Sequence, residues 1–299
     1  MTPLARARTH VSEATVGMLL VAPAVLLLAT LTVYPVLYGA WISVFNKHSF
    51  FPEQTFVGFG NYAYVLTDPQ FWDSVRLGSI YALSSIALQI ILGVAAALVV
   101  NETFPGRNIV RSILIFPYVI PTVLAVILWK WLLNSQFGLV NYLLEDAGLI
   151  SQPISWMSKD WIMTSLVLVS VWQFFPFVML AVLARLQSIP HELHEAAAID
   201  GANALQRFIH VTLPQLKAVL FIVVLLRSIW MFTKFDTPWL MILGGGAETY
   251  IRTLPVYTYQ RTFAYYEAGI GSAMAVLMFL MLVAITAVYF RLFKREEAL

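Results

Sequence analysis

The stretch Ser188–Gly201, SIPHELHEAAAIDG, lies between two long apolar segments and has the pattern of a short polar helix followed by a sharp turn. Pro190 suits the first turn of a helix, and Glu192 is favourable near the positive N-terminal end of the helix dipole. The alanine run that follows favours helix, and Gly201 can adopt a positive φ. We therefore predict a helix from Pro190 to Ile199 that ends in a turn at Gly201.

The same polar segment continues beyond this turn. A second short helix is expected from Asn203 to about His210, and Leu213-Pro214 is expected to restart the chain into the next apolar segment. The small side chains of an alanine-faced helix bury little area, but they let the backbone of another protein come close. The pattern therefore indicates a docking element, and the simpler alternative is a connector between two membrane spans.

The composition places this segment in a membrane protein. Of 299 residues, 60% are hydrophobic and only 11% are charged, and the mean hydropathy is +0.79. Soluble domains are about 45–50% apolar and about 25% charged. So few charges cannot cover a soluble surface, so most of the outside must face lipid. The absence of cysteine excludes disulfides, cysteine-ligated metal sites and thiol chemistry.

Six apolar stretches are long enough to cross a bilayer, which takes about 20 residues each. The first is too long for the apolar region of a signal peptide. No repeat or flexible linker separates another domain, so residues 1–299 are expected to form one membrane domain. The predicted spans are about 16–45, 74–100, 109–133, 161–183, 218–243 and 268–290, with the polar loop 185–217 between the fourth and fifth.

The cations predict the orientation of these spans. Ten of them fall on the side that holds both termini, and four fall in the opposite loops. By the positive-inside rule, both termini and the 185–217 loop are expected in the cytoplasm. The ten are Arg6, Arg8, Arg107, Arg111, Arg185, Arg207, Lys217, Arg291, Lys294 and Arg295, and the four are Lys47, Lys159, Arg252 and Arg261.

The polar loop also resembles a known motif. Glu195-Ala196-Ala197 is followed after three residues by Gly201, and Val211 and Leu213-Pro214 come further along. This spacing is similar to that of the EAA loop of binding-protein-dependent ABC importer permeases. The family usually has Ile at the position of Val211, a mild departure that keeps an apolar anchor.

The resemblance extends over nearly the whole chain. It is to the maltose and glycerol-3-phosphate branch of carbohydrate importers, and within that branch to the first of its two permease subunits, the maltose-type F subunit. The segments that carry it are Tyr34-Pro35, Phe56–Tyr62, Asp68–Trp72, Phe235-Asp236 and Gly244–Gly246. The resemblance implies an all-α, six-span permease of the type I ABC importer fold in a bacterial or archaeal inner membrane. Such a permease forms half of the pathway for a sugar or sugar-like solute.

The resemblance also implies partners and a coupling site. The partners are a second permease, an ATPase dimer that holds ATP and Mg, and an external solute-binding protein; membrane lipid surrounds the chain, which itself binds no cofactor, metal or nucleic acid. The helix from Pro190 to Ile199 is then the coupling helix that docks in the ATPase. The coupling residues are Glu195, Ala196, Ala197, Asp200, Gly201, Leu213 and Pro214.

Aromatic and polar residues in the spans are candidates for the solute path, because sugars bind through hydrogen-bonding groups and through aromatic faces. The fourth span, which Pro176 is expected to break, and the fifth supply them. The candidates are Trp172, Gln173, Phe174, Trp230, Phe235 and Asp236, with Gln89 as a weaker one. Packing between helices is the alternative role of these aromatics, and pairing with Asp236 is the plain role of Lys234 and Arg227. Those two cations would also suit an anionic solute.

Other functional classes are weaker. An ion-coupled carrier is the main alternative, but no Asp or Glu lies clearly at the centre of a span. An enzyme is disfavoured: His191 and His194 are three residues apart, whereas a zincin helix needs four. Gly244–Gly246 lacks the Lys-Ser/Thr of a nucleotide-binding loop. We therefore expect a transport subunit without catalytic residues.

Overall fold

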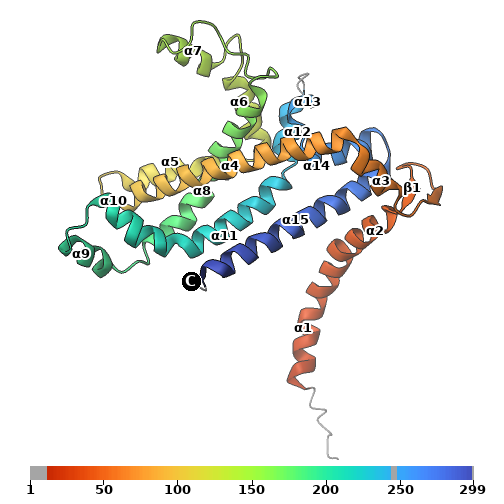
Figure 1. The fold of residues 1–299 in the computed structure, drawn as a ribbon, viewed down its shortest axis with the longest axis horizontal. Coiled ribbons are helices and arrows are strands. Elements are labelled where there is room, and N and C mark those ends of the chain that lie inside the picture. The colour runs from red at the N-terminus through yellow and green to blue at the C-terminus, as the bar shows by residue number, and fades with distance from the viewer. Residues whose placement is uncertain (1–11, 244–247, 298–299) are drawn as a thin grey trace, which may run out of the picture. The chain divides into compact units, whose positions relative to one another are not determined.

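The computed structural model describes residues 12–243 and 248–297. The predictions that concern Arg6, Arg8 and Gly244–Gly246 lie outside the described residues. The described chain is almost entirely helical, apart from one hairpin of two short strands (Figure 1). This confirms the all-α prediction.

Five helical segments of the described chain are long and apolar enough to cross a membrane, and a sharply bent pair raises the count to six if the pair is one span. Their bounds differ from the predicted ones by a few residues at most ends, and by more in the fifth. The segments are Ala14–Ile42, Pro69–Asn101, Ile162–Leu186, Ala204–Ile242 and Ala268–Arg291, and the bent pair is Arg107–Val119 with Thr122–Leu132.

The third predicted span is the bent pair, α5 (Arg107–Val119) and α6 (Thr122–Leu132), which meet at 102°. Pro121 has no N–H and disfavours helical geometry in the residue before it. Ile120 is accordingly extended, with ψ 131°. The predicted span over 109–133 is therefore bent at Ile120-Pro121, a bend that apolar composition alone does not show.

The fourth span, α8 (Ile162–Leu186), runs through Pro176 without interruption. The expected break there is wrong, and Pro176 is buried inside the helix. Close packing surrounds this helix. A Cβ added at Gly93 of α4 (Pro69–Asn101) would lie 2.5 Å from the Cβ of Val178, so the two backbones approach closely at that point.

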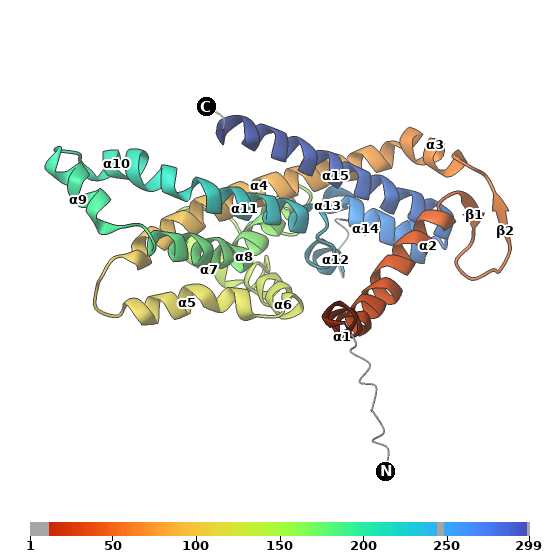
Figure 2. The ribbon, with the colours of Figure 1, turned by 90° about the horizontal axis from the view of Figure 1, so that it is seen from below.

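The contacts within the chain form two compact units. The second unit, Leu66–Gln260 and Leu277–Leu299, is built around α4, α8 and α11 (Leu213–Phe232), which lie side by side (Figure 1). Both views place α9 and α10 at one end of these helices and α12, α13 and α14 towards the other (Figure 2). The further helices of this unit are α7 (Leu139–Asp146), α9 (His191–Ile199), α10 (Ala204–Arg207), α12 (Asp236–Ile242), α13 (Glu248–Ile251) and α14 (Leu254–Tyr259).

The first unit, Met1–Val65 and Arg261–Val276, contains the N-terminal apolar helix and the hairpin. Its hairpin is held by Asn61, whose side-chain amide donates to the carbonyl oxygens of Ser43 at 2.8 Å and Phe45 at 2.9 Å. No residue in the apolar window of its first span is buried. Its elements are α1 (Glu13–Leu28), η1 (Ala29–Val33), α2 (Tyr34–Ile42), β1 (Phe45–Lys47), β2 (Gln54–Phe56) and most of η3 (Gln260–Ala264), while α3 (Gly60–Thr67) and α15 (Ala268–Glu297) run between the units.

Candidate functional site

The loop between α8 and α11 contains the predicted short helix, α9 (His191–Ile199). Its C-terminal end is closed by two backbone hydrogen bonds, from Gly201 N–H to the Ala198 carbonyl at 3.0 Å and from Ala202 N–H to the Ala197 carbonyl at 2.9 Å. This pair of bonds is the Schellman motif, which needs a left-handed residue after the helix. Gly201 supplies it with φ +81°, which confirms the predicted turn.

The chain re-enters helix directly after this turn. Asn203 caps α10 through a reciprocal pair of bonds with Gln206, at 2.9 Å and 2.8 Å. Helix then continues through a π-helical turn, η2 (Phe208–Thr212), into α11. The predicted end at about His210 is therefore wrong, because helix continues through η2, whereas α11 does begin at Leu213-Pro214 as predicted. A wider turn lets helix continue up to Pro214, whose ring would otherwise clash with the carbonyl four residues earlier.

The predicted coupling residues lie in two places. Glu195, Ala196, Ala197, Asp200 and Gly201 are gathered on α9 and its turn, whereas Leu213 and Pro214 begin α11. Large apolar side chains on the loop are uncovered: Leu193 is 42% exposed, Ile199 86% and Leu205 66%. Burying an apolar side chain of this size is worth about 1.5–3 kcal/mol, so this surface favours a protein partner.

Arg185 joins the loop to the helix bundle, a contact that the sequence alone did not indicate. Its Nε donates to the Gln215 carbonyl at 2.9 Å, and one terminal nitrogen donates to the Gln215 side-chain oxygen at 2.8 Å. Leu216, the next residue of α11, is completely buried. The start of α11 is thereby fixed to the end of α8.

A second candidate site lies within the spans, at Arg227 of α11. Arg227 is only 3% exposed, and its Nε donates to the Gln89 side-chain oxygen of α4 at 2.7 Å. Gln89 in turn donates to the Ser170 carbonyl of α8 at 3.1 Å, and the Ser170 hydroxyl bonds the Tyr81 hydroxyl at 2.7 Å. This network joins the three central helices at membrane depth, where an ionisable residue marks a functional site by default.

Aromatic rings surround the same cation. The Arg227 guanidinium lies 4.9 Å from the centre of the Phe174 ring and 5.7 Å from that of Trp230. Lys234 lies 4.4 Å from the centre of the Phe174 ring and pairs with Asp236 at 3.0 Å. The expected pairing of Asp236 is thus confirmed for Lys234. Among the described residues the polar partners of Arg227 are instead Gln89 and the sulfur of Met231.

The six predicted path residues therefore do not form one site. Phe174, Trp230 and Asp236 lie in the group around Arg227 and Lys234. The other three have different neighbours. Trp172 packs edge-on against Trp129, Gln173 donates to the Ile120 carbonyl at 3.1 Å, and Phe235 stacks on Trp239.

Gln173 thus binds a carbonyl that the break between α5 and α6 leaves without a helical partner. Neighbouring residues of a helix point in different directions, so the adjacent residues Trp172, Gln173 and Phe174 do not face one site.

The geometry is that of a helical membrane bundle with a protruding loop at one end and a buried cation between spans. A family model described as "Binding-protein-dependent transport system inner membrane component" matches residues 89–297. The chain belongs to this family.

Relatives of this inner membrane component cover it almost from end to end. The trehalose/maltose transport system permease protein MalF of Thermococcus litoralis is 36% identical, over 95% of this chain and 96% of the relative. The sulfoquinovosyl glycerol transport system permease protein SmoG of Agrobacterium fabrum is 34% identical, over 94% of this chain and 91% of the relative. A chain of a bacterial ABC transporter involved in alginate import has the same fold, with a TM-score of 0.82 and 19% identity over 95% of this chain and 96% of that one.

Membership of this family decides between the classes that the sequence left open. The chain is a membrane permease subunit of an ABC-type importer and not an enzyme. The ion-coupled carrier receives no support from the family or from the named relatives.

Proposed function

We propose that this permease forms half of the pathway of an ATP-driven importer for a sugar or sugar-like solute, in the cytoplasmic membrane of a bacterium or archaeon. Its partners are a second permease, an ATPase dimer and an external solute-binding protein. Both termini and the α9 loop face the cytoplasm. The names of two relatives, which refer to trehalose or maltose and to sulfoquinovosyl glycerol, support the carbohydrate class.

The coupling proposal rests on the 86% exposure of Ile199 on α9. The Schellman motif closes this helix, and helix follows it from Ala204 to Phe232. In this proposal the ATPase binds the exposed side of α9. Glu195 makes polar contacts there, and Ala196 and Ala197 allow close approach. ATP and Mg are held by the ATPase subunits, and their closure moves α9.

The start of α11 transmits this motion. Leu213 and Pro214 lie where the π-helical turn meets α11, and the bonds of Arg185 to Gln215 fix the same turn to α8. Asp200 lies at the hinge between α9 and α10. A shift of the loop therefore reaches the spans without a flexible linker. The two-state element is the packing of α11 against α4 and α8.

The solute path runs past the group around Arg227. Trp230 is 41% exposed and the Asp236 side chain 44%, so a ring face and a carboxylate are available to a passing solute. Arg227 is held by its bond to Gln89 and Lys234 by its pair with Asp236, and both cations pack against the Phe174 ring. Weak hydroxyl contacts suit transport, while affinity and selectivity lie mainly in the external binding protein.

Reconstitution tests the proposal. The chain is placed in proteoliposomes with the second permease, the ATPases and the solute-binding protein loaded with trehalose. Uptake should need ATP and all four components and should be unaffected by a proton ionophore. Uptake by this chain alone that the ionophore abolishes would overturn the proposal. A binding protein that carries a solute without hydroxyl-rich character would overturn the carbohydrate class.

A further inference from the structure

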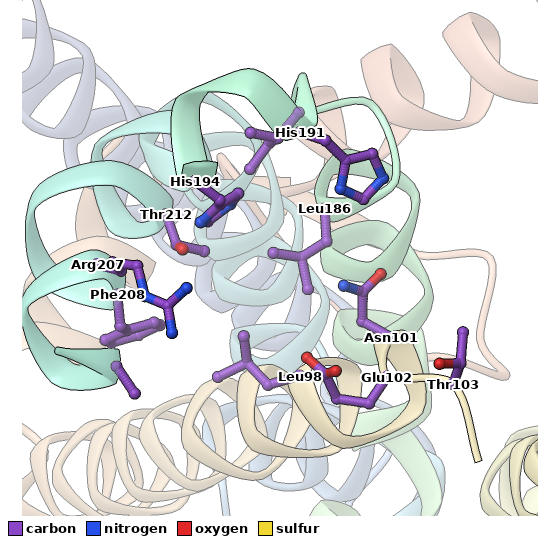
Figure 3. Close-up of a pocket in the computed structure, with 12 residues that line it drawn as sticks. Leu98, Asn101, Glu102, Thr103, Leu186, His191, His194, Arg207, Phe208 and Thr212 are labelled. Carbon is purple, nitrogen blue, oxygen red and sulfur yellow. The ribbon is translucent and has the colours of Figure 1, made fainter. Parts of the chain in front are cut away.

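A cavity of about 580 Å³ lies between α9 and the ends of the spans (Figure 3). Its walls come from the C-terminal end of α4, the end of α8, α9 itself, and the α10–η2 segment. The lining residues with polar side chains are Asn101, Glu102, Thr103, His191, His194, Arg207 and Thr212. Ligand sites in proteins have volumes of about 300–1,000 Å³, so this cavity is large enough for a small metabolite.

The polar groups of this cavity converge without satisfying one another. Arg207 and His194 reach in from one side, and Asn101 and Glu102 face them from the other (Figure 3). The Arg207 Nε is shielded from solvent and has no hydrogen-bond partner within residues 12–243 and 248–297. The terminal nitrogens of the same guanidinium point into the cavity (Figure 3), and they are the donors that a bound group can reach.

The two walls differ in chemistry. Arg207 and His194 present donors on one wall, and a guanidinium is the side chain best suited to hold a phosphate through two parallel bonds (Figure 3). The opposite wall presents the Glu102 carboxylate and the Asn101 amide, which suit hydroxyl groups. Phe208, beside Arg207, also lines the cavity and offers an apolar surface (Figure 3). One end of the cavity thus fits a phosphate, and the other fits a polyol.

We propose that this cavity binds a sugar phosphate, with the phosphate on Arg207 and His194 and the hydroxyls on Glu102 and Asn101. An acidic side chain of the ATPase is the competing occupant. The arrangement of α9 disfavours it, because His194 lies on the opposite side of the helix from Ala196 and the 86% exposed Ile199. Docking through the exposed side leaves the cavity unfilled.

Binding here has a consequence that rests on the proposed function of α9. A ligand that contacts α9, α10 and α4 together ties the moving loop to the bundle. Since coupling requires the loop to shift, an occupied cavity slows transport. A phosphorylated sugar, which forms when an imported sugar is phosphorylated in the cytoplasm, would therefore limit further import.

Binding is measured first, on the complex purified in nanodiscs, so that it does not depend on transport. The probes are glucose 6-phosphate, glucose and inorganic phosphate, and calorimetry measures the affinity of each. We expect glucose 6-phosphate to bind at least about tenfold more tightly than either fragment, since it uses both walls. No binding of glucose 6-phosphate would overturn the proposal, and equal binding of inorganic phosphate would overturn the sugar half of it.

Variants locate the site. Arg207→Gln should weaken glucose 6-phosphate binding at least about tenfold, because it removes charge-assisted bonds. Arg111→Gln, which removes a partly buried cation that does not line the cavity, is the control and should bind normally. His194→Gln serves as a second variant if Arg207→Gln does not assemble. Unchanged affinity in the assembled Arg207→Gln or His194→Gln complex would overturn the proposed site.

Inhibition is measured separately. Glucose 6-phosphate inside proteoliposomes should slow ATP-driven uptake of trehalose by the unmodified complex and not by Arg207→Gln. Binding without inhibition would overturn the regulatory consequence and leave the site. Loss of ATP-driven uptake by the unmodified complex, with binding intact, would count against the proposed function instead.

Discussion

Gly201 offers the sharpest test of the α9 loop, because the chain contains a matched control for it. Gly201 has φ +81° with no atom within 4 Å of an added Cβ, and Gly106, in the turn before α5, has the same φ and the same open surroundings. Substitution by aspartate therefore imposes similar backbone strain at both positions. Only Gly201→Asp also disturbs the closing bonds of α9.

The magnitude follows from the local geometry. A left-handed conformation costs a non-glycine residue about 1 kcal/mol. Relaxing that strain sacrifices the two closing bonds, from Gly201 and Ala202, at about 1 kcal/mol each. The cost to the closed loop is therefore about 1–2 kcal/mol, since the variant either carries the strain or gives up the bonds, and it lowers the ratio of closed to open loop about 5- to 30-fold. It is below the stability of a typical folded protein, about 5–15 kcal/mol, so insertion into the membrane should survive.

The assay is ATP-driven solute uptake by the assembled transporter, normalised to the amount of permease in the membrane. Gly201→Asp should reduce uptake about 5- to 30-fold, whereas Gly106→Asp should stay within about twofold of the unmodified protein. Near-normal uptake by Gly201→Asp, or an equal loss in both variants, would refute the role of the turn.

Two further predictions concern the packing of the spans, and both are measured by thermal unfolding in detergent. Gln89→Leu leaves the buried Arg227 without its 2.7 Å acceptor and should lower the free energy of unfolding by about 2–3 kcal/mol. Gln89→Glu keeps an acceptor and should lower it less. Equal losses in the two variants would argue against the bond. Gly93→Ala forces a Cβ to within 2.5 Å of Val178 and should destabilise by about 1–3 kcal/mol. Gly39→Ala, on a helix with no atom within 4 Å, is its control and should be neutral or slightly stabilising; a matching loss there would show that close approach is not the cause.

The features that the sequence predicted well are those with a local cause. Length and apolar composition located the spans, because a bilayer demands them. Asp200-Gly201 located the end of α9, because a left-handed turn favours glycine. The resemblance of the same loop to the EAA motif indicated the family.

The features that it missed depend on residues far apart in the chain. Arg227 and Gln89 are separated by 138 positions, and nothing local indicates that they meet. Gln173 was expected on the solute path, but the bend between α5 and α6 leaves a carbonyl that it satisfies instead. The π-helical turn before Pro214 was also missed, because a proline is equally compatible with a restart or with a widened helix.

The measurement that tests the central claim most directly is cross-linking from the exposed side of α9. The chain has no cysteine, so Ile199→Cys introduces a unique thiol at a position that is 86% exposed. Leu149→Cys, 72% exposed in the loop predicted on the other side of the membrane, is the control. In the assembled complex Ile199→Cys should cross-link to an ATPase subunit and should resist a membrane-impermeant maleimide in intact cells, while Leu149→Cys should do neither. Labelling of Ile199→Cys from outside, or no cross-link to the ATPase, would contradict the account.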